Sequence, residues 1–345
     1  MKGIAHFVTG IALATLFPQV VGRASEGSLL PVIGGIAGIL PDTIDFKFLR
    51  YFEQHTLEID PGPDPDPWGI AEQVAAAMRR AYESGESQDV MLHTIRLGGD
   101  LWRQYTIRFD SERGEVAVRV GPVVSTGQVP LPGSEPQDGE EARIKVGPPM
   151  AQTYPGETDI DIFSGPSFRF ERQADALQVR FLPWHRRWSH SVTLAAALAL
   201  GTSGLWALHQ LLVDGRSTST SLWAGVVVGL GLLGHILEDQ LGFMGSNLLY
   251  PFTRARTRGL GLLRSGDAIP NFLTVWSAAM LIVFNLDRFS AQPGLIPPWL
   301  LGTAVALPVV VLGGVYHLQR RAWPRSQEVL QQLDIISETE DIELA

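Results

Sequence analysis

The chain has 345 residues, a formal net charge of −9 and no cysteine. The negative charge argues against a nucleic-acid-binding protein, because such proteins usually carry a basic patch. The lack of cysteine excludes disulfides and metal sites built on thiolates. Hydrophobic residues make up 45% of the chain and are gathered in runs. This distribution is typical of a membrane protein.

Six runs of apolar residues are candidates for membrane segments. Several approach the roughly 20 residues that an α-helix needs to span a bilayer. The second run is short and fits a tilted, half-inserted or protein-buried helix. The first run lacks a clear cleavage site, so we expect a retained helix rather than a signal peptide. The sequence predicts a mainly α fold, a polytopic membrane helical bundle of about six segments. The runs lie near residues 4–21, 28–41, 191–213, 221–241, 271–286 and 295–316.

Between the second and third runs lies a long stretch without an apolar run of membrane length. Apolar positions at helical spacing predict a short helix over 69–84, and the Pro- and Gly-rich stretch 125–157 predicts a long loop. Strict alternation of apolar and polar residues predicts two β-hairpins. The alternating residues are Tyr105, Ile107 and Phe109 with Val116, Val118 and Val120, then Phe168 and Phe170 with Leu177, Val179 and Phe181.

These features divide the chain into four parts. The long stretch predicts a soluble, mainly β insertion that interrupts the membrane helices. The expected parts are membrane helices one and two (1–50), the insertion (51–182), membrane helices three to six (183–325) and a polar tail (326–345).

Loop charge predicts the orientation of these helices, because Lys and Arg concentrate in cytoplasmic loops near helix ends. With six spans, one set of helix ends carries twelve Lys and Arg residues, whereas the other carries only Arg23, Arg216 and Arg288. We therefore expect both termini and the insertion to be cytoplasmic in an inner-membrane, multi-pass protein.

Seven possible metal ligands or catalytic groups fall at predicted helix ends. His235 and Asp239 have i,i+4 spacing and share one helix face where an apolar run reaches water. Such groups at the edge of hydrocarbon are costly unless paired or bound to a cation. The predicted orientation, which did not use these residues, puts all seven at cytoplasmic ends. They are His6, Asp42, Asp45, His185, His190, His235 and Asp239.

Each of these residues has a simpler explanation when taken singly. A lone histidine at a membrane boundary usually snorkels or caps a helix, Asp42 after Pro41 can be a turn residue, and Arg186 and Arg187 are expected to be topology signals. The joint pattern nevertheless favours a divalent metal, Zn²⁺ first and Mn²⁺ second, since these ions take imidazole and carboxylate ligands. The expected ligands are His6, Asp42, His190, His235 and Asp239.

The order of these motifs resembles a known family, the YdjM-like proteins, described as LexA-binding, inner-membrane-associated metal-dependent hydrolases. The resemblance covers about 1–50 and 183–275 and implies a membrane-embedded hydrolase fold. The family's usual Asp-x-Asp is Asp42-Thr43-Ile44-Asp45 here, which leaves the second Asp ligand open. The sequence offers no reason to transfer LexA binding. The motifs are Leu40-Pro41-Asp42, His185-Arg186-x-x-Ser189-His190-Ser191, Gly234-His235-x-x-x-Asp239 and Leu249-Tyr250-Pro251-Phe252.

The predicted function is metal-dependent hydrolysis of a phosphoester in a lipid or amphipathic substrate at the cytoplasmic interface. Asp45 is expected to bridge ions, to orient a histidine or to act as general base. His185 is the other catalytic candidate, although it lies five residues from His190 and off the same helical face. The basic residues that could hold a phosphate headgroup, or simply attract anionic lipid, are Arg254, Arg256 and Arg258.

Two functions of other classes remain open. One is a non-catalytic membrane scaffold with a structural metal or polar cluster and a protein partner on the insertion. The other is a transporter, which is disfavoured because the polar residues lie at one end of the helices rather than near the midplane.

Overall fold

The computed structural model describes residues 2–48, 54–125, 130–136, 141–151, 157–160, 165–182, 186, 188–242, 245–253, 255, 257–264, 266–290 and 294–322. The chain forms two compact units. The helical unit consists of Met1–Lys47 and His185–Ala345, and the β unit consists of Phe48–Trp184. The described fold is therefore mixed, so the mainly α prediction is confirmed only in part. The expected polar tail 326–345 lies outside the described residues.

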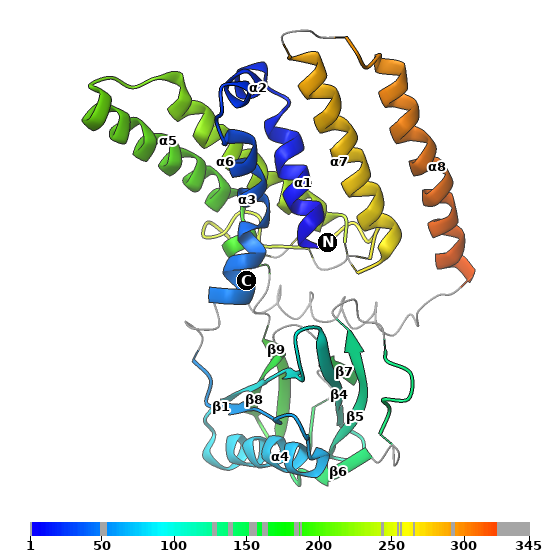
Figure 1. Cartoon of the computed structure of the whole chain (residues 1–345). Coiled ribbons are helices and arrows are strands. Elements are labelled where there is room, and N and C mark those ends of the chain that lie inside the picture. The colour runs from blue at the N-terminus through cyan, green and yellow to red at the C-terminus, as the bar shows by residue number, and fades with distance from the viewer. Residues whose placement is uncertain are drawn as a thin grey trace. The chain divides into compact units, whose positions relative to one another are not determined.

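Three helices form the centre of the helical unit. They are α1 (Gly3–Ala14), α3 (Leu30–Thr43) and α6 (Ser219–Gln240), and each contacts the other two (Figure 1). A short π-helix, Ile44–Phe48, continues α3. Small residues occupy the positions where these helices meet, which lets their backbones approach closely.

Glycines allow the backbones of these three helices to touch. A Cβ atom added to Gly10 or to Gly231 would lie 2.3 Å from the carbonyl oxygen of Gly34. A Cβ atom on Gly38 would lie 2.4 Å from the carbonyl oxygen of His6. No side chain larger than hydrogen fits at such distances, so these contacts fix how α1, α3 and α6 lie against one another.

The first apolar run is not one continuous helix. After α1 ends, α2 (Pro18–Ser25) begins at an angle of 99° to it. Pro18 has no N–H to donate to the carbonyl of Ala14, and its ring favours the first turn of a new helix. The single helix predicted over this run is therefore two helices, and the bent pair is either one broken span or a re-entrant loop.

The remaining helices of this unit are arranged outside the centre: α5 (Val192–Asp214) packs on α6, α7 (Ala268–Arg288) on α1, and α8 (Pro298–Ala322) on α7. In the described residues, four helices are long and apolar enough to cross a membrane, namely α5, α6, α7 and α8, or up to five with the bent pair. The expected six segments are thus not confirmed, since α3 has only 14 residues.

The outward surface of α5 is apolar. Leu200 is 75% exposed and Leu212 is 77% exposed. Burying such side chains in lipid removes apolar surface from water, which is worth about 25 cal/mol per Å². The exposure is typical of a helix that faces hydrocarbon.

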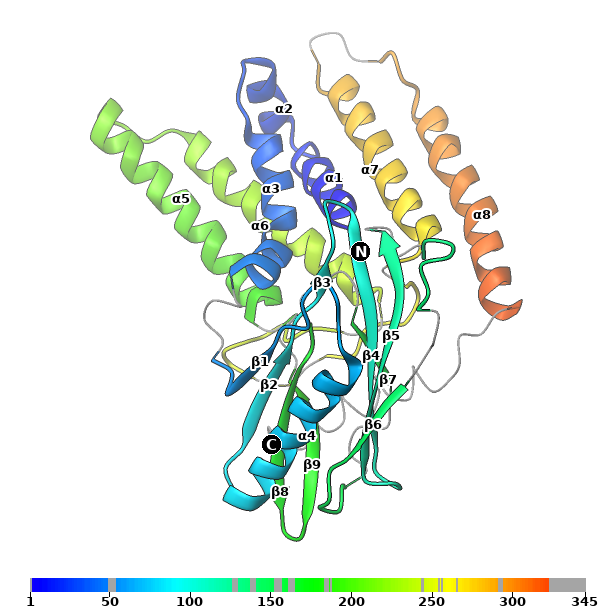
Figure 2. The ribbon, with the colours of Figure 1, turned by 60° about the horizontal axis from the view of Figure 1, so that its bottom comes forward.

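Two sheets make up the β unit (Figure 2). In the first sheet β1 runs parallel to β2, and the other neighbours are antiparallel. Its order is β1 (Leu57–Ile59), β2 (Gln88–Leu92), β8 (Ser167–Gln173) and β9 (Ala176–Leu182). The second, antiparallel sheet has the order β3 (Ile95–Arg96), β4 (Leu101–Asp110), β5 (Glu115–Ser125) and β6 (Glu141–Lys145), and β7 (Glu157–Ile160) also pairs with β4.

One helix, α4 (Pro67–Ser84), packs against strands of both sheets. Asp66 caps its start by accepting a hydrogen bond from the backbone N–H of Trp68 at 3.0 Å, and Gly85, with φ of 73°, ends it in the left-handed conformation. The core between helix and sheets includes Met78, whose side chain is fully buried. The predicted helix over 69–84 is therefore confirmed.

Both predicted hairpins are present. In the first, Tyr105 pairs with Val120, and in the second Phe170 pairs with Val179. The predicted long loop over 125–157 is wrong in part, because β6 lies within it and pairs with β5 from Glu115↔Lys145 to Arg119↔Glu141. The short alternating run in β6 was hidden by the Pro- and Gly-rich sequence around it.

The close backbone contact between Gly10 and Gly34 can be tested by adding a methyl group at Gly10. Gly10→Ala should destabilise the helical unit by about 1–3 kcal/mol, the usual cost of overpacking. Gly201→Ala is the matched control, because its added Cβ meets nothing within 4 Å on exposed α5. The control should be neutral or slightly stabilising, since Ala favours helix over Gly. Thermal unfolding in detergent measures both, and equal stabilities for the two variants would contradict the packing account.

Candidate metal centre

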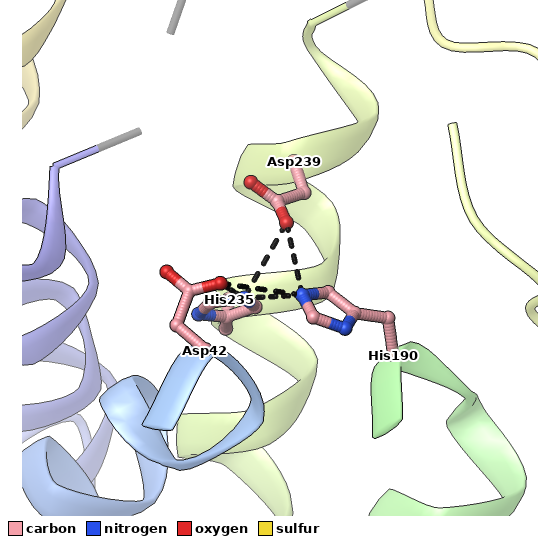
Figure 3. A group of neighbouring side chains, drawn as sticks. All are labelled: Asp42, His190, His235 and Asp239. Carbon is pink, nitrogen blue, oxygen red and sulfur yellow. Dashed lines mark hydrogen bonds and ion pairs between the residues drawn. The ribbon is translucent and has the colours of Figure 1, made fainter. Parts of the chain in front are cut away.

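Four side chains from three separate elements converge in the helical unit. Asp42 comes from α3, His190 from the 3₁₀-helix Trp188–His190, and His235 and Asp239 from α6 (Figure 3). Each offers one ligand atom, and these four atoms all lie within 4.8 Å of one another. This group, called the cluster below, could hold a metal ion.

The distances within the cluster suit a small divalent ion. Nε2 of His190 and Nε2 of His235 lie 3.0 Å apart, and Oδ1 of Asp42 is 3.5 Å from each of them. Oδ2 of Asp239 is 3.3 Å from His190 Nε2 and 3.4 Å from His235 Nε2. Ligands at about 2.0–2.1 Å from a tetrahedral ion are separated by about 3.3–3.4 Å. These five distances are close to that separation, and the sixth, between the oxygens of Asp42 and Asp239, is within 4.8 Å.

Both imidazoles are oriented by hydrogen bonds to their second nitrogen. Nδ1 of His235 lies 2.7 Å from the carbonyl oxygen of Gly38, which can only accept, so this nitrogen carries the proton. Nδ1 of His190 lies 2.9 Å from Ser189 Oγ and 3.3 Å from Asp45 Oδ2. Outer partners of this kind fix the ring and its tautomer in metal sites. They direct both Nε2 atoms at the same point.

Negative charge is concentrated around this point. Asp45, Glu238 and Asp239 are buried, and Asp42 is half-buried. Buried Arg186 supplies a positive charge, with its guanidinium NH2 3.0 Å from Asp239 Oδ1. Four carboxylates and one guanidinium thus meet in the described part of the chain. Burying charge is costly unless it is balanced, which favours a bound cation or protonated histidines here.

Arg186 links two of the carboxylates. Its backbone N–H donates to Asp45 Oδ2 at 3.0 Å, while its side chain pairs with Asp239. It has a φ of 65°, in the left-handed region that non-glycine residues rarely adopt. The sequence predicted only a topology signal at Arg186, because neither the inverted backbone nor the burial of the side chain is visible in residue spacing.

The cluster also changes the protonation of His190, which lies outside the membrane-length helices. Burial lowers the pKa of His190, but hydrogen bonds to Asp239, Asp42 and Asp45 outweigh burial and raise it to about 10. Without a metal, the imidazole therefore holds a proton at neutral pH. An incoming ion takes the place of that proton.

The structure places the ten predicted site residues in four different ways. His190, His235, Asp42 and Asp239 form the cluster. His6 and Asp45 lie beside it, with the ring of His6 packed at a tilt of 36° against that of His235, 3.9 Å between ring centroids. Three others, His185, Arg254 and Arg256, lie outside the described residues.

The last predicted residue, Arg258, is exposed on a segment that runs along the end of α6. In that segment Leu260 N–H donates to the carbonyl oxygen of Gln240 at 2.7 Å, and Gly261 N–H to that of Gly242 at 2.8 Å. Residues 257–264, which carry Arg258 and Arg264, therefore lie next to the end of α6 that carries Asp239.

Sequence reasoning missed Glu238. Its Oε2 lies 2.6 Å from Nδ1 of His6, and its Oε1 accepts a hydrogen bond from Thr9. Glu238 directly precedes a predicted ligand, Asp239, but adjacent residues on a helix point in different directions. Only the approach of α1 to α6 brings this carboxylate to His6.

Comparison with known proteins gives one family. Residues 158–319 match the family model YdjM inner membrane protein. The match confirms the YdjM-like resemblance and contains His190, His235 and Asp239, whereas His6 and Asp42 lie outside it. No curated protein and no solved structure matches the chain. The YdjM match and the four apolar helices together indicate a membrane location.

Metal binding should depend on both histidines of the cluster. His190→Ala and His235→Ala each remove a ligand, so each should weaken metal affinity by more than the roughly 10–100-fold loss typical of an outer partner. His209→Ala, an exposed histidine on α5, should leave metal content unchanged. Metal analysis of protein purified in detergent measures all three. Equal metal content in the three variants would reject the cluster as a metal site.

Metal affinity should also rise with pH. Since the pKa of His190 is raised to about 10 in the metal-free cluster, protons compete with the ion throughout the neutral range. Affinity should increase by up to about tenfold per pH unit between about pH 7 and pH 10, with about one proton released per ion bound. Titration calorimetry in buffers of different ionisation enthalpy counts these protons. Affinity that is constant over this range would contradict the assignment.

Proposed function

We propose that this chain is a membrane-bound, metal-dependent hydrolase that acts on a phosphoester of a lipid or amphipathic substrate at the cytoplasmic face. The observation that carries the proposal is the convergence of two Nε2 atoms, 3.0 Å apart, with one carboxylate oxygen each from Asp42 and Asp239. Nitrogen and oxygen donors without sulfur suit Zn²⁺ or Mn²⁺. Such an ion supplies a Lewis acid and lowers the pKa of a coordinated water.

The surrounding residues hold the ligands in place. Asp45 orients His190, the carbonyl of Gly38 orients His235, and Arg186 orients Asp239. Of the three roles open to Asp45, the contacts favour orientation of a histidine, because its Oδ2 meets Nδ1 of His190 and the backbone N–H of Arg186. Preorganised ligands of this kind need little rearrangement during reaction.

Asp42 marks the accessible side of the cluster. Its side chain is 22% exposed, whereas those of His190, His235 and Asp239 are 1% exposed or less. Substrate would therefore approach past Asp42. The cluster lies near the C-terminal ends of α3 and α6, and the basic segment with Arg258 runs beside the end of α6. A helix end beside basic residues suits an amphipathic substrate with an anionic headgroup.

A second candidate is the non-catalytic scaffold with a structural metal and a protein partner on the β unit. It is favoured by the number of protein ligands, because closed four-ligand sites are typical of structural zinc, whereas catalytic sites keep a position for water. Water-proton relaxation of the Mn²⁺-loaded protein separates the two. An exchangeable water on the ion supports the hydrolase, and its absence supports the scaffold.

The proposed orientation can be tested with single cysteines, because the chain has none of its own. Glu112→Cys, in the exposed β4–β5 turn, should be protected from a membrane-impermeant maleimide in intact spheroplasts. Arg216→Cys, in the exposed α5–α6 turn, should be labelled. Both should react after permeabilisation. Labelling of Glu112→Cys in intact spheroplasts would reject a cytoplasmic β unit and, with it, the cytoplasmic substrate.

Hydrolysis is tested by turnover of a panel of phospholipids and soluble phosphoesters in nanodiscs, with and without chelator. Asp239→Asn keeps the size of the side chain but weakens charge donation to the ion, so activity should fall at least tenfold, a larger effect than the one on stability. His209→Ala is the control and should keep full activity. Activity that survives both chelation and Asp239→Asn would reject the mechanism, and inactivity of metal-loaded protein across the panel would favour the scaffold.

A further inference from the structure

His6 occupies a position that the four-residue cluster does not explain. It lies on α1, its side chain is fully buried, and its ring packs at a tilt against that of His235. On one side Nδ1 lies 2.6 Å from Oε2 of Glu238, whose other oxygen accepts a hydrogen bond from Thr9. This carboxylate attracts the ring proton to the Nδ1 side, which leaves the lone pair on Nε2, although within the described residues neither Nδ1 nor Oε2 makes a hydrogen bond.

That lone pair faces the outer oxygens of two cluster carboxylates. Nε2 of His6 lies 3.9 Å from Oδ2 of Asp42 and 3.8 Å from Oδ1 of Asp239. The opposite oxygens of these residues, Oδ1 of Asp42 and Oδ2 of Asp239, are the ones that face His190 and His235. Each carboxylate therefore has one oxygen toward the cluster and one toward His6.

The distances from Nε2 of His6 to these two carboxylate oxygens fit a shared metal ion better than a direct hydrogen bond. Within the described residues, Nε2 of His6 is buried and makes no hydrogen bond. Distances of 3.8–3.9 Å exceed the 2.7–3.2 Å of an N–H···O hydrogen bond. Two donor atoms bound at about 2.1 Å to one ion, at a wide angle, are separated by about this distance. A lone pair facing two anionic oxygens in a buried site calls for a cation between them.

We propose that His6 Nε2, Asp42 Oδ2 and Asp239 Oδ1 hold a second divalent cation, which the two carboxylates bridge to the ion of the cluster. Glu238 positions His6, and Thr9 positions Glu238. Oδ1 of Asp239 also accepts from Arg186 at 3.0 Å, and a carboxylate oxygen with two lone pairs can serve both. The proposal rests on the metal cluster of the proposed function, but not on its hydrolytic activity.

A second ion would narrow the substrate class. Three protein ligands leave positions open for oxygen ligands from the substrate. Pairs of ions about 3.5–4 Å apart are typical of enzymes that hydrolyse phosphoesters, since they clamp both the attacking and the leaving oxygen. A second ion at this site is therefore compatible with the phosphoester substrate of the proposed function.

Metal stoichiometry tests the proposal directly. Full-length protein in detergent is loaded with Zn²⁺, or with Mn²⁺ in parallel, dialysed and analysed for metal. We expect two ions per chain in the wild type and in His209→Ala, and one in His6→Ala. One ion in the wild type, two ions in His6→Ala, or loss of both ions from folded His6→Ala would each overturn the second site. No ion in the wild type would overturn the metal cluster as well. Failure of the second site alone, with one ion bound, is therefore distinguishable from failure of the whole metal centre.

Glu238→Gln provides a second test that keeps the shape of the site, in case His6→Ala does not fold. Replacing the positioning carboxylate should weaken the second ion by about 10–100-fold while the affinity of the first changes little. Stepwise titration with Mn²⁺, followed by electron paramagnetic resonance, resolves the two affinities and the coupling between adjacent ions. Unchanged affinity of both ions in Glu238→Gln would overturn the role of Glu238, and uncoupled signals at full loading would overturn the bridge.

Discussion

The excess of buried carboxylate is the constraint on which the helical unit depends. Asp45, Glu238 and Asp239 are buried, and Asp42 joins them at the accessible side. Such a group is stable only if positive charge lies among the oxygens, because unpaired charge in a protein interior costs several kcal/mol. Arg186 supplies part of that charge, and a divalent ion between two histidines would supply the rest. The buried histidines, the left-handed backbone conformation of Arg186 and the meeting of the helix ends all bring positive charge or its ligands to these carboxylates.

Close helix packing is what makes this concentration of charge possible. Gly10 on α1 and Gly231 on α6 both lie against the backbone of Gly34 on α3. The three helices therefore meet along one line of close contact, called the seam. At the end of that seam, the carbonyl oxygen of Gly38 accepts a hydrogen bond from Nδ1 of His235. The same small residues that permit packing therefore bring the ligands within reach of one another. A wider separation would leave each carboxylate at its own helix end, exposed to water or lipid.

Much of the site could be predicted from the sequence because its signals are local. The i,i+4 spacing of His235 and Asp239 fixes their common face, and the distribution of Lys and Arg grouped these residues with Asp42 and His190. Spacing could not decide between Asp42 and Asp45, since residues three apart on a helix share a face. The structure separates them: Asp42 faces Nε2 of His190, and Asp45 faces Nδ1.

Other features depend on contacts between distant segments and leave no local signal. Glu238 contacts His6 because α1 packs on α6. Arg186 is buried with a left-handed backbone conformation, which no sequence motif predicts. The break at Pro18 was visible in the sequence, but the apolar run around it suggested continuity. In the β unit, the hairpins followed from alternation, whereas β6 was obscured by the glycines and prolines that flank it.

Anomalous X-ray diffraction from crystals of the Zn²⁺-loaded protein tests the central claim most directly, because it locates the metal without reference to activity. The account predicts an anomalous peak about 2.0–2.2 Å from Nε2 of both His190 and His235, with an oxygen of Asp42 and of Asp239 also bound. A fully loaded crystal with no peak at this position, or with its metal bound to neither histidine, would contradict it.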